Sequence, residues 1–357
     1  MRSELFDYDL PPERIAQTPL EPRDAARLLH VRPDGIREHR GFRELPSLLN
    51  PADLLVFNDT RVLPARLHGR KLNPSPAGDP VETSEGAQVE ALLLRRLEGA
   101  RWEALVHPGR RLRVGARISF GDGELTAEVV AHGDEGSRIL AFSAPDGDPD
   151  AAIHRLGHAP LPPYIHTRLE DEERYQTVYA RPDHEGSAAA PTAGLHFTPE
   201  VFAALQERGV ETAYVTLHVG LATFRPIKAE TIEEHEMHAE WYSVPPETAA
   251  AIAACRARGG QVVAVGTTTV RCLESWALSE GRETEGFHPT RLYVTPGFRF
   301  RLVDQLLTNF HMPRSSLLVL VSAFAGYETI RATYAEALAQ GYRFLSFGDA
   351  MLLHRQP

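Results

Sequence analysis

Hydrophobic residues follow two patterns along most of the chain, short continuous runs and runs in which they recur every three or four positions. The continuous runs predict buried strands at 53–57, 262–265, 291–295 and 342–347, and a further strand that breaks at Gly220. The second pattern predicts helices between Thr198 and Gly209, at 247–258, after Gly266, at 317–325 and at 330–339. Strands that alternate with helices are typical of an α/β fold.

Residues 65–150 have a different pattern, in which short β-rich segments alternate with glycine-containing turns. Strands are predicted at 88–95, 102–106, 117–120, 125–130 and 138–142, which indicates a small antiparallel barrel or sandwich. The prolines in 160–163 mark the return of the chain. We therefore expect a discontinuous α/β catalytic domain, with a layered mixed sheet and helices, made of residues 1–64 and 151–357. Residues 65–150 form an inserted domain.

Composition narrows the class of protein. A chain of 357 residues with 43% hydrophobic and 24% charged residues is an ordinary globular protein with room for two domains. The longest apolar run, Leu317–Ala325, is too short to span a bilayer, and the charged start MRSELFDYDL is not a signal peptide. The two cysteines exclude a disulfide framework and a Cys-based zinc site, which fits a reducing cytoplasm. With a net charge of −10, a nucleic-acid partner would need a local basic face.

A polar group follows the predicted strand at 53–57, namely Asn58, Asp59, Thr60 and Arg61. Because α/β proteins bind ligands at the carboxyl ends of strands, this position predicts a ligand site. An Asx-type turn with Arg61 in solvent is the alternative.

Two segments that flank the helix after Thr198 each contain a histidine. Residues 188–197 are small and turn-forming and end in His196 and Phe197, whereas residues 216–224 contain His218 and break at Gly220. A loop, a helix, a strand and a second loop would form one βα-type unit. We expect 191–197 and 218–224 to line one pocket.

Gly266–Thr269 joins the strand at 262–265 to a helix that contains Arg271. The start of this helix would present free N–H groups and hydroxyls, which suit a carboxylate or a phosphate. The segment is neither a P-loop nor a GxGxxG fingerprint. A polar turn with capping threonines fits the same residues.

Three further groups carry possible chemistry. His235 and His238 are three apart rather than the four of the zincin pattern, so acid–base work by one histidine is favoured over a metal site. Asn309 offers donors and acceptors to the edge of a base, and Phe310 offers a ring for stacking. The densest basic stretch, Arg110–Arg117, suits phosphate contacts, although a solvated strand face is the commoner reason for such a stretch.

Taken together, these motifs resemble the S-adenosylmethionine:tRNA ribosyltransferase-isomerase family of queuosine biosynthesis. The resemblance is carried, in order, by FDYDLPPERIAQTP, DLLVFNDTRVLPARL, SAAAPTAGLHFT, VTLHVGLATFRPI, HEMHAEWYSV, VGTTTVRCLES, VTPGFRFRLVDQLLTNFHMPRSSLLVLVSAFAG and RFLSFGDAMLL. These motifs are long and unusual and extend over nearly the whole chain. Agreement is weakest at 73–87 and 279–290.

The resemblance implies a transferase that takes the ribosyl group of S-adenosylmethionine and isomerises it. The acceptor is the 7-aminomethyl-7-deazaguanine wobble base of tRNAs with GUN anticodons, and the products are epoxyqueuosine-tRNA, adenine and methionine. The resemblance also implies an α/β domain interrupted by a small β-barrel. Such an enzyme is a cytoplasmic monomer that uses S-adenosylmethionine as co-substrate, without a prosthetic group, a metal or a membrane partner.

On this interpretation three histidines, His196, His218 and His311, are candidates for proton transfer at the ribose C5′ and at the leaving adenine. The sequence does not assign either step to a particular histidine. Asp59 and Arg61, with Thr267, Thr268 and Arg271, are candidates for holding the methionine end. The complete set of expected substrate-binding residues is Asn58, Asp59, Arg61, Thr192, Gly194, Phe197, Gly220, Phe224, His238, Thr267, Thr268, Arg271, Asn309 and Phe310.

Two other classes of function fit parts of the chain. One is a nucleotide transferase that uses the Gly266 loop for phosphate and never meets tRNA. The other is a non-catalytic RNA-binding module built on residues 65–150. Release of adenine and methionine that depends on modified tRNA distinguishes both from the first interpretation.

Overall fold

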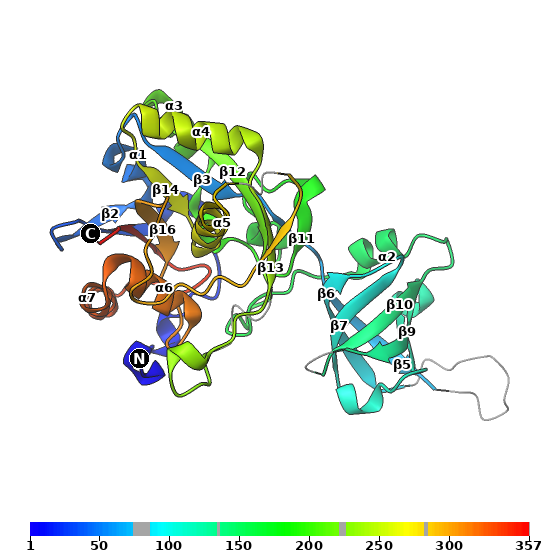
Figure 1. Cartoon of the computed structure of the whole chain (residues 1–357). Coiled ribbons are helices and arrows are strands. Elements are labelled where there is room, and N and C mark those ends of the chain that lie inside the picture. Colours follow the sequence, from blue (N-terminus) through cyan, green and yellow to red (C-terminus); the bar gives the residue numbers. More distant parts are fainter. Residues whose placement is uncertain (74–85, 134–135, 221–225, 282–284, 357) are drawn as a thin grey trace. The chain divides into compact units, whose positions relative to one another are not determined.

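The computed structural model describes residues 1–73, 86–133, 136–220, 226–281 and 285–356 (Figure 1). Internal contacts divide the chain into two compact units. The first is Met1–Arg61 together with Pro162–Pro357, and the second is Val62–Leu161.

The first unit is built on a mixed sheet that has nine strands within the described residues. In spatial order the strands are β15 (His288–Thr290), β13 (Glu240–Ser243), β12 (Glu211–His218), β3 (Leu54–Asn58), β14 (Val262–Val265), β16 (Gln305–Asn309), β17 (Ala350–His354), β1 (Arg27–Val31) and β2 (Arg37–Gly41). A separate two-stranded sheet consists of β11 (Glu185–Ser187) and β4 (Arg61–Val62).

Four central strands end at the same edge of the sheet. β12, β3, β14 and β16 are mutually parallel. β17 runs antiparallel to β16, with Ala350 opposite Asn309, so β17 starts where β16 ends. The carboxyl ends of the parallel strands and the loop before β17 therefore converge, which is where open α/β sheets bind ligands.

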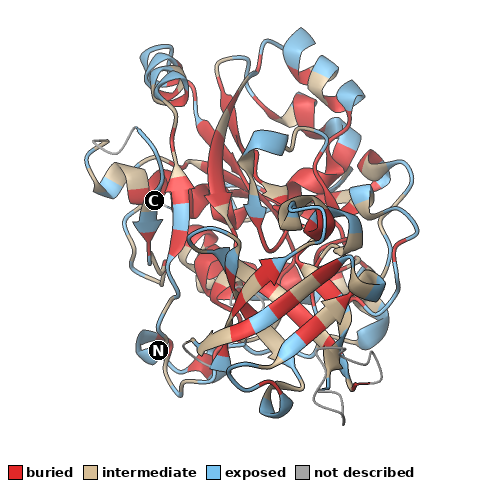
Figure 2. Cartoon of the chain, turned by 90° about the vertical axis from the view of Figure 1, so that its right-hand side faces the viewer, coloured by how far each residue is buried: buried red, intermediate tan, exposed pale blue. Residues whose placement is uncertain are grey.

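Helices cover both faces of this sheet, because its central strands are apolar on both sides (Figure 2). Leu54 and Val56 of β3 face one core, together with α4 (Pro246–Ala257), α5 (Thr267–Leu278), α6 (Ser316–Ala325) and α7 (Tyr327–Ala339). Leu55 and Phe57 face the opposite core, together with α1 (Leu45–Leu48) and α3 (Pro199–Glu207). The strand period of two thus places alternate residues of one strand in two separate cores.

The predicted helix boundaries are confirmed where a cap could be recognised in the sequence. The Thr198 hydroxyl accepts a hydrogen bond from the Val201 N–H at the start of α3, and the Ser315 hydroxyl accepts one from the Leu318 N–H at the start of α6. Gly326, just past α6, has a φ of 90°, a value that L-residues with a Cβ rarely adopt.

Two predicted strands are wrong. Residues 291–295 and 342–347 contain no strand; the strands nearby are β15 and β17. The N–H groups of 342–347 are bonded outside any sheet ladder. The Arg343 N–H donates to the Asp349 carboxylate, and the Leu345 N–H donates to the Phe310 carbonyl. Apart from a single parallel bridge between Phe344 and Ile15, the segment is buried by packing and not by strand pairing, so its apolar pattern resembles that of a buried strand.

The second unit is a closed antiparallel barrel. Its strands are, in order, β10 (Arg138–Ser143), β7 (Arg101–His107), β6 (Gln88–Arg96), β5 (Arg66–Leu72), β8 (Arg117–Phe120) and β9 (Leu125–His132). Alternate residues such as Val89, Ala91 and Leu93 fill its interior, and α2 (Pro149–Leu156) packs against it. The predicted α/β fold with an inserted β-barrel is confirmed, although β5 and α2 were not anticipated.

The chain also contains short 3-10 helices, at η1 (Ser3–Phe6), η2 (Pro12–Arg14), η3 (Arg23–Ala25), η4 (Phe42–Glu44), η5 (Gly109–Arg111), η6 (Gly121–Gly123), η8 (Glu172–Tyr175), η9 (Pro182–His184), η10 (Thr192–His196) and η12 (Ile232–Glu234). Within the described ranges, none of the helices has the length and apolar character needed to cross a membrane.

Candidate functional site

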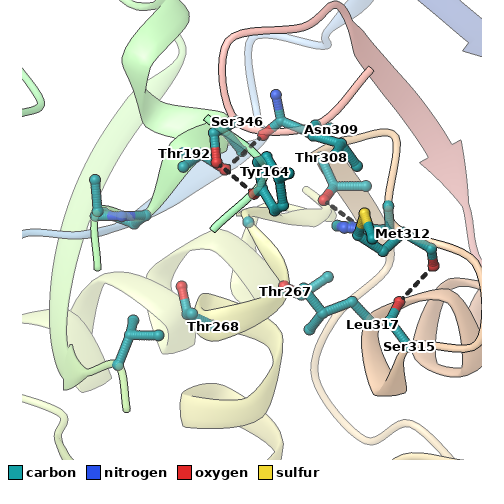
Figure 3. Close-up of a pocket in the computed structure, with 17 residues that line it drawn as sticks. Tyr164, Thr192, Thr267, Thr268, Thr308, Asn309, Met312, Ser315, Leu317 and Ser346 are labelled. Carbon is teal, nitrogen blue, oxygen red and sulfur yellow. Dashed lines mark hydrogen bonds between the residues drawn. The ribbon is translucent and has the colours of Figure 1, made fainter. Parts of the chain in front are cut away.

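A pocket opens at the carboxyl ends of β14 and β16, beside the starts of α5 and α6 (Figure 3). It contains about 660 Å³ of empty space, part of it open to solvent. The residues that line it are Tyr164, Ala190, Pro191, Thr192, Ala193, Val219, Gly266, Thr267, Thr268, Thr308, Asn309, His311, Met312, Ser315, Leu317, Leu345 and Ser346. Nine of these residues have polar side chains and the others are apolar or glycine. None carries a formal charge, apart from an imidazole whose charge depends on protonation. Such a lining suits an uncharged nucleoside better than a phosphate.

The start of α5 forms one wall of the pocket. Gly266 adopts a φ of 90° and a ψ of 152° and supplies no side-chain cap, so the first N–H groups of α5 stay available. The Gly266 N–H itself donates to the Leu307 carbonyl of β16, 2.8 Å away. Thr267 and Thr268 add hydroxyls to this wall. The predicted polar helix start is therefore present, and it opens into a cavity.

Asn309, the last residue of β16, connects the pocket to the η10 turn. Its Oδ1 accepts a hydrogen bond from the Thr192 hydroxyl at 3.0 Å, and its Nδ2 lies 3.3 Å from Nε2 of His196. His196 itself does not line this pocket; it lines a smaller hollow with Arg23 and Phe347. The amide of Asn309 thus stands between the imidazole of His196 and the pocket.

His311 lines the pocket directly. Its Nε2 lies 3.1 Å from the Thr308 hydroxyl, and its backbone N–H donates to the Tyr334 hydroxyl at 2.9 Å. Burial lowers the pKa of His311 to about 3, because the low-dielectric surroundings disfavour the imidazolium. Burial likewise lowers the pKa of His196 to about 4. Both rings are therefore neutral at neutral pH.

Two pocket residues escaped the analysis of the sequence. The Tyr164 hydroxyl lies 2.8 Å from the Ser346 hydroxyl, and both residues line the pocket. Burial raises the pKa of Tyr164 to about 12, so the phenol stays protonated and can donate. Tyr164 lies in the proline-rich segment interpreted as a linker, where no pattern marked it. Ser346 lies in the conspicuous RFLSFGDAMLL stretch, which could have directed attention to it.

Within the described residues, the two histidine-containing segments lie side by side, but they contribute unequally to the pocket. The Ala188 N–H donates to the Val219 carbonyl at 3.0 Å, and Pro191, Thr192 and Val219 all line the pocket. His218 does not line the pocket; its Nδ1 lies 2.9 Å from the hydroxyl of Thr60. Phe224 lies outside the described residues.

His218 belongs to a separate polar cluster beyond β3. Its ring stacks on Phe287 with centroids 4.9 Å apart, and burial, with a smaller effect of His184, lowers its pKa to about 4. In the same cluster the Asp59 carboxylate accepts a hydrogen bond from the Thr216 hydroxyl at 2.7 Å and pairs with His184 Nδ1 at 2.9 Å.

Arg61 pairs with Glu173 and lies 3.9 Å from Glu185, away from the pocket. The side chain of Asn58, at the end of β3, mainly forms hydrogen bonds to the backbone of the neighbouring strand β12. Its Oδ1 accepts from the Leu217 N–H at 2.9 Å and its Nδ2 donates to the Leu217 carbonyl at 3.0 Å, although Nδ2 also lies 3.4 Å from the Thr268 hydroxyl. The structure does not bring Asn58, Asp59 or Arg61 into the pocket lining.

Three expected substrate residues have packing roles in this structure. Phe197 lies in the core with Phe42 and Phe57, and the ring of Phe310 is enclosed by neighbouring aromatic rings. A Cβ on Gly194 would come within 1.9 Å of the Tyr179 hydroxyl, so glycine is required there. None of these residues offers a free face to a ligand.

Arg271 is buried one turn after Thr267 and pairs with the buried carboxylate of Glu240, a residue that the sequence did not single out. The other oxygen of Glu240 accepts a hydrogen bond from the Gly220 N–H at 2.9 Å.

His238 is exposed. In the described part of the chain, no group of three or more His, Cys, Asp or Glu side chains is arranged to hold a metal ion.

Comparison with known proteins agrees with this geometry. The family model described as "Queuosine biosynthesis protein" matches residues 3–353. The chain belongs to this family. A family member from Moorella thermoacetica, an S-adenosylmethionine:tRNA ribosyltransferase-isomerase, is 55% identical over 354 residues, which cover 99% of this chain and 100% of the relative. A relative of the same name from Symbiobacterium thermophilum is 54% identical with the same coverage.

A solved structure of the family shares the fold. The crystal structure of S-adenosylmethionine tRNA ribosyltransferase from Thermotoga maritima is 39% identical to this chain and has a TM-score of 0.52. The match covers 98% of this chain and 99% of that protein. The resemblance inferred from the motifs is therefore confirmed over the whole length.

Proposed function

We propose that this family member transfers and isomerises the ribosyl group of S-adenosylmethionine onto the 7-aminomethyl-7-deazaguanine wobble base of tRNAs with GUN anticodons. The products are epoxyqueuosine-tRNA, adenine and methionine. The observation that carries the proposal is the uncharged pocket, lined by polar and apolar side chains, at the carboxyl ends of β14 and β16, in a chain that is 55% identical over its length to an enzyme of that name.

The pocket suits the nucleoside part of S-adenosylmethionine. Asn309 and Thr192 offer an amide and a hydroxyl to the edge of adenine or to the ribose, and Tyr164 offers a phenol that stays protonated. An uncharged pocket also accepts the sulfonium without placing a fixed cation against it.

His311 is the proposed proton carrier, since it alone of the three candidate histidines lines the pocket. The sulfonium acidifies the ribose C5′ hydrogens, and a neutral imidazole can accept one of them. Burial makes the resulting imidazolium a strong acid, so it readily gives the proton to the departing adenine. His196 would act through the amide of Asn309, and His218 would act only if substrate reached its separate cluster.

The acceptor tRNA requires a basic face. Arg110, Arg111 and Arg113 are exposed on the barrel, next to the start of β8. We assign phosphate contacts to this group, because guanidinium groups bind phosphate oxygens in a bidentate manner.

Incubation of the protein with S-adenosylmethionine and tRNA tests the proposal. Adenine and methionine should be released with tRNA that carries 7-aminomethyl-7-deazaguanine, and not with tRNA that carries guanine at the same position. ATP turnover without tRNA would instead support a nucleotide transferase, and tRNA binding with no turnover would support an RNA-binding module.

Substitution of His311 tests whether this residue carries the proton. His311→Gln should reduce single-turnover adenine release at least about a hundredfold, while S-adenosylmethionine still binds. The matched control is His166→Gln, at an exposed histidine outside the pocket lining. Unchanged turnover in a folded His311→Gln variant would contradict the role of His311.

A further inference from the structure

A second, smaller cavity lies beside the first. It contains about 250 Å³ of empty space, part of it open to solvent, and is lined by Met237, Arg271, Leu292, Tyr293, Val294, Ser316, Leu317 and Leu320. Leu317 lines both cavities, and the neighbouring residues Ser315 and Ser316 line one each. The two cavities are therefore neighbours at the start of α6, with Leu317 between them.

Two polar atoms in the lining of this cavity have no hydrogen-bond partner within the described residues. They are Nη2 of Arg271 and the hydroxyl oxygen of Tyr293, and both atoms are buried. Arg271 is only 4% exposed. A buried donor without a partner costs free energy, so its persistence here points to a ligand that supplies the acceptor.

The remaining donors of Arg271 are held in place. Nε donates to the Leu292 carbonyl at 3.0 Å, and Nη1 donates to the carboxylate of Glu240. The guanidinium is thus oriented before any ligand arrives, and Nη2 is the part left free. Glu240 balances its charge, which keeps the buried site neutral overall.

We infer that this cavity holds the amino-acid end of S-adenosylmethionine, with the carboxylate on Arg271 Nη2 and the Tyr293 hydroxyl. The ammonium lies next to the Arg271–Glu240 pair, in which Glu240 stands outside the cavity lining. The inference rests on the proposed function and deepens it. A zwitterion fits because a pair of opposite charges accepts it without leaving a buried charge unpaired. Leu292, Leu317 and Leu320 supply apolar surface for the methylene groups.

The spacing along α5 agrees with this placement. Thr267 lines the first cavity and Arg271 lines the second, one turn later on the same helix face. Four residues of helix rise about 6 Å, which is comparable to the extended chain from the sulfonium sulfur to the methionine carboxyl carbon.

Calorimetric binding of S-adenosylmethionine and of its decarboxylated analogue, which keeps the ammonium but lacks the carboxylate, tests the inference on the full-length protein. The unchanged protein should bind S-adenosylmethionine at least about tenfold more tightly. The double variant Arg271→Met, Glu240→Gln removes both buried charges together and should reduce this preference to about twofold or less.

Two further variants make the result decisive. Tyr293→Phe deletes only the unpartnered hydroxyl, so it should fold normally and still reduce the preference severalfold. Arg258→Met with Glu211→Gln removes another Arg–Glu pair, at 2.8 Å near the start of β12, and should leave the preference unchanged.

The outcomes separate the inference from the proposed function. Equal affinity for the two ligands in the unchanged protein, or an undiminished preference in the folded Tyr293→Phe and double variants, would overturn the subsite and leave the function standing. Failure of the unchanged protein to bind either ligand, even with modified tRNA present, would overturn the proposed function itself. If the double variant does not fold, Tyr293→Phe decides the question.

Discussion

The amide nitrogen of Asn309 lies 3.3 Å from Nε2 of His196. Asn309 ends β16 and His196 ends the η10 turn, so this contact joins two segments that are 113 residues apart in the sequence. The Thr192 hydroxyl donates to the other end of the same amide. An asparagine at this position therefore both shapes the wall of the pocket and orients a neutral imidazole behind it.

Removal of this amide should reduce activity more than stability. We expect Asn309→Ala to lower kcat/KM for adenine release by about two- to tenfold, because a hydrogen bond between neutral groups contributes about 0.5–1.5 kcal/mol. The matched control is Gln305→Ala, at the opposite end of β16, where the side chain donates to Gln261 at 2.6 Å. The control should be destabilised by a similar amount, about 1–2 kcal/mol, with kcat/KM retained. Equal activity losses in both variants would show that Asn309 acts only on stability.

Gly266→Ala should weaken the binding of S-adenosylmethionine. An alanine fits sterically, since its Cβ would meet the Thr268 hydroxyl at 3.5 Å and Ala193 at 3.8 Å, but a φ of 90° strains it. Relief of that strain, about 1–3 kcal/mol, displaces the start of α5. Gly259→Ala, at another glycine with positive φ (76°) and open space around it, is the control. Calorimetry should show a several-fold loss of affinity in Gly266→Ala alone.

Acid should destabilise the protein through its buried histidines. The folded pKa values of His311 and His196 are about 3 and about 4, below the ordinary value of 6.5. The unfolded chain therefore binds more protons as the pH falls below about 6.5, and stability decreases from there down to about pH 4. Each residue should contribute about 2 kcal/mol of lost stability between pH 7 and pH 5.

Urea unfolding at pH 7 and at pH 5 measures this loss. His311→Gln should reduce the difference between the two pH values, whereas His166→Gln, at an exposed site, should preserve it. A difference that is the same in His311→Gln and in the unchanged protein would mean that the imidazole is not held neutral by burial.

The basic group on the barrel should set part of the affinity for tRNA. Arg110→Ala with Arg111→Ala is expected to weaken binding and to lower the slope of log K against log salt by about 1–2, since each phosphate contact releases about one counterion. Arg32→Ala with Arg331→Ala removes the same charge from exposed sites of the other unit and should have little effect. Filter binding of tRNA at several salt concentrations compares the two double variants. An unchanged slope would exclude these arginines from the tRNA surface.

Much of the fold was predictable because caps and strand ends are local signals. Thr198, Ser315 and Gly326 bound helices where their chemistry indicated. The polar residues after β14 and β16 lined a pocket for the same reason, since parallel strands end at one edge.

What could not be predicted depended on contacts between distant segments. Phe310 was expected to stack on a base, yet its ring centroid lies 4.7 Å from that of Phe344, which no local pattern reveals. Likewise, Glu240 is significant only because it meets Arg271. The segment at 342–347 is buried mainly by packing, with one bridge from Phe344 to Ile15 in place of a strand. Sequence spacing identifies which residues are unusual, whereas the topology decides which of them meet.

A crystal structure of the protein with S-adenosylmethionine bound tests the central claim most directly, because it locates the ribose C5′ carbon. The adenosine should occupy the pocket between the ends of β14 and β16, in contact with Thr192, Asn309 and His311. An adenosine bound instead at the cluster of His218, His184 and Asp59 would contradict the account.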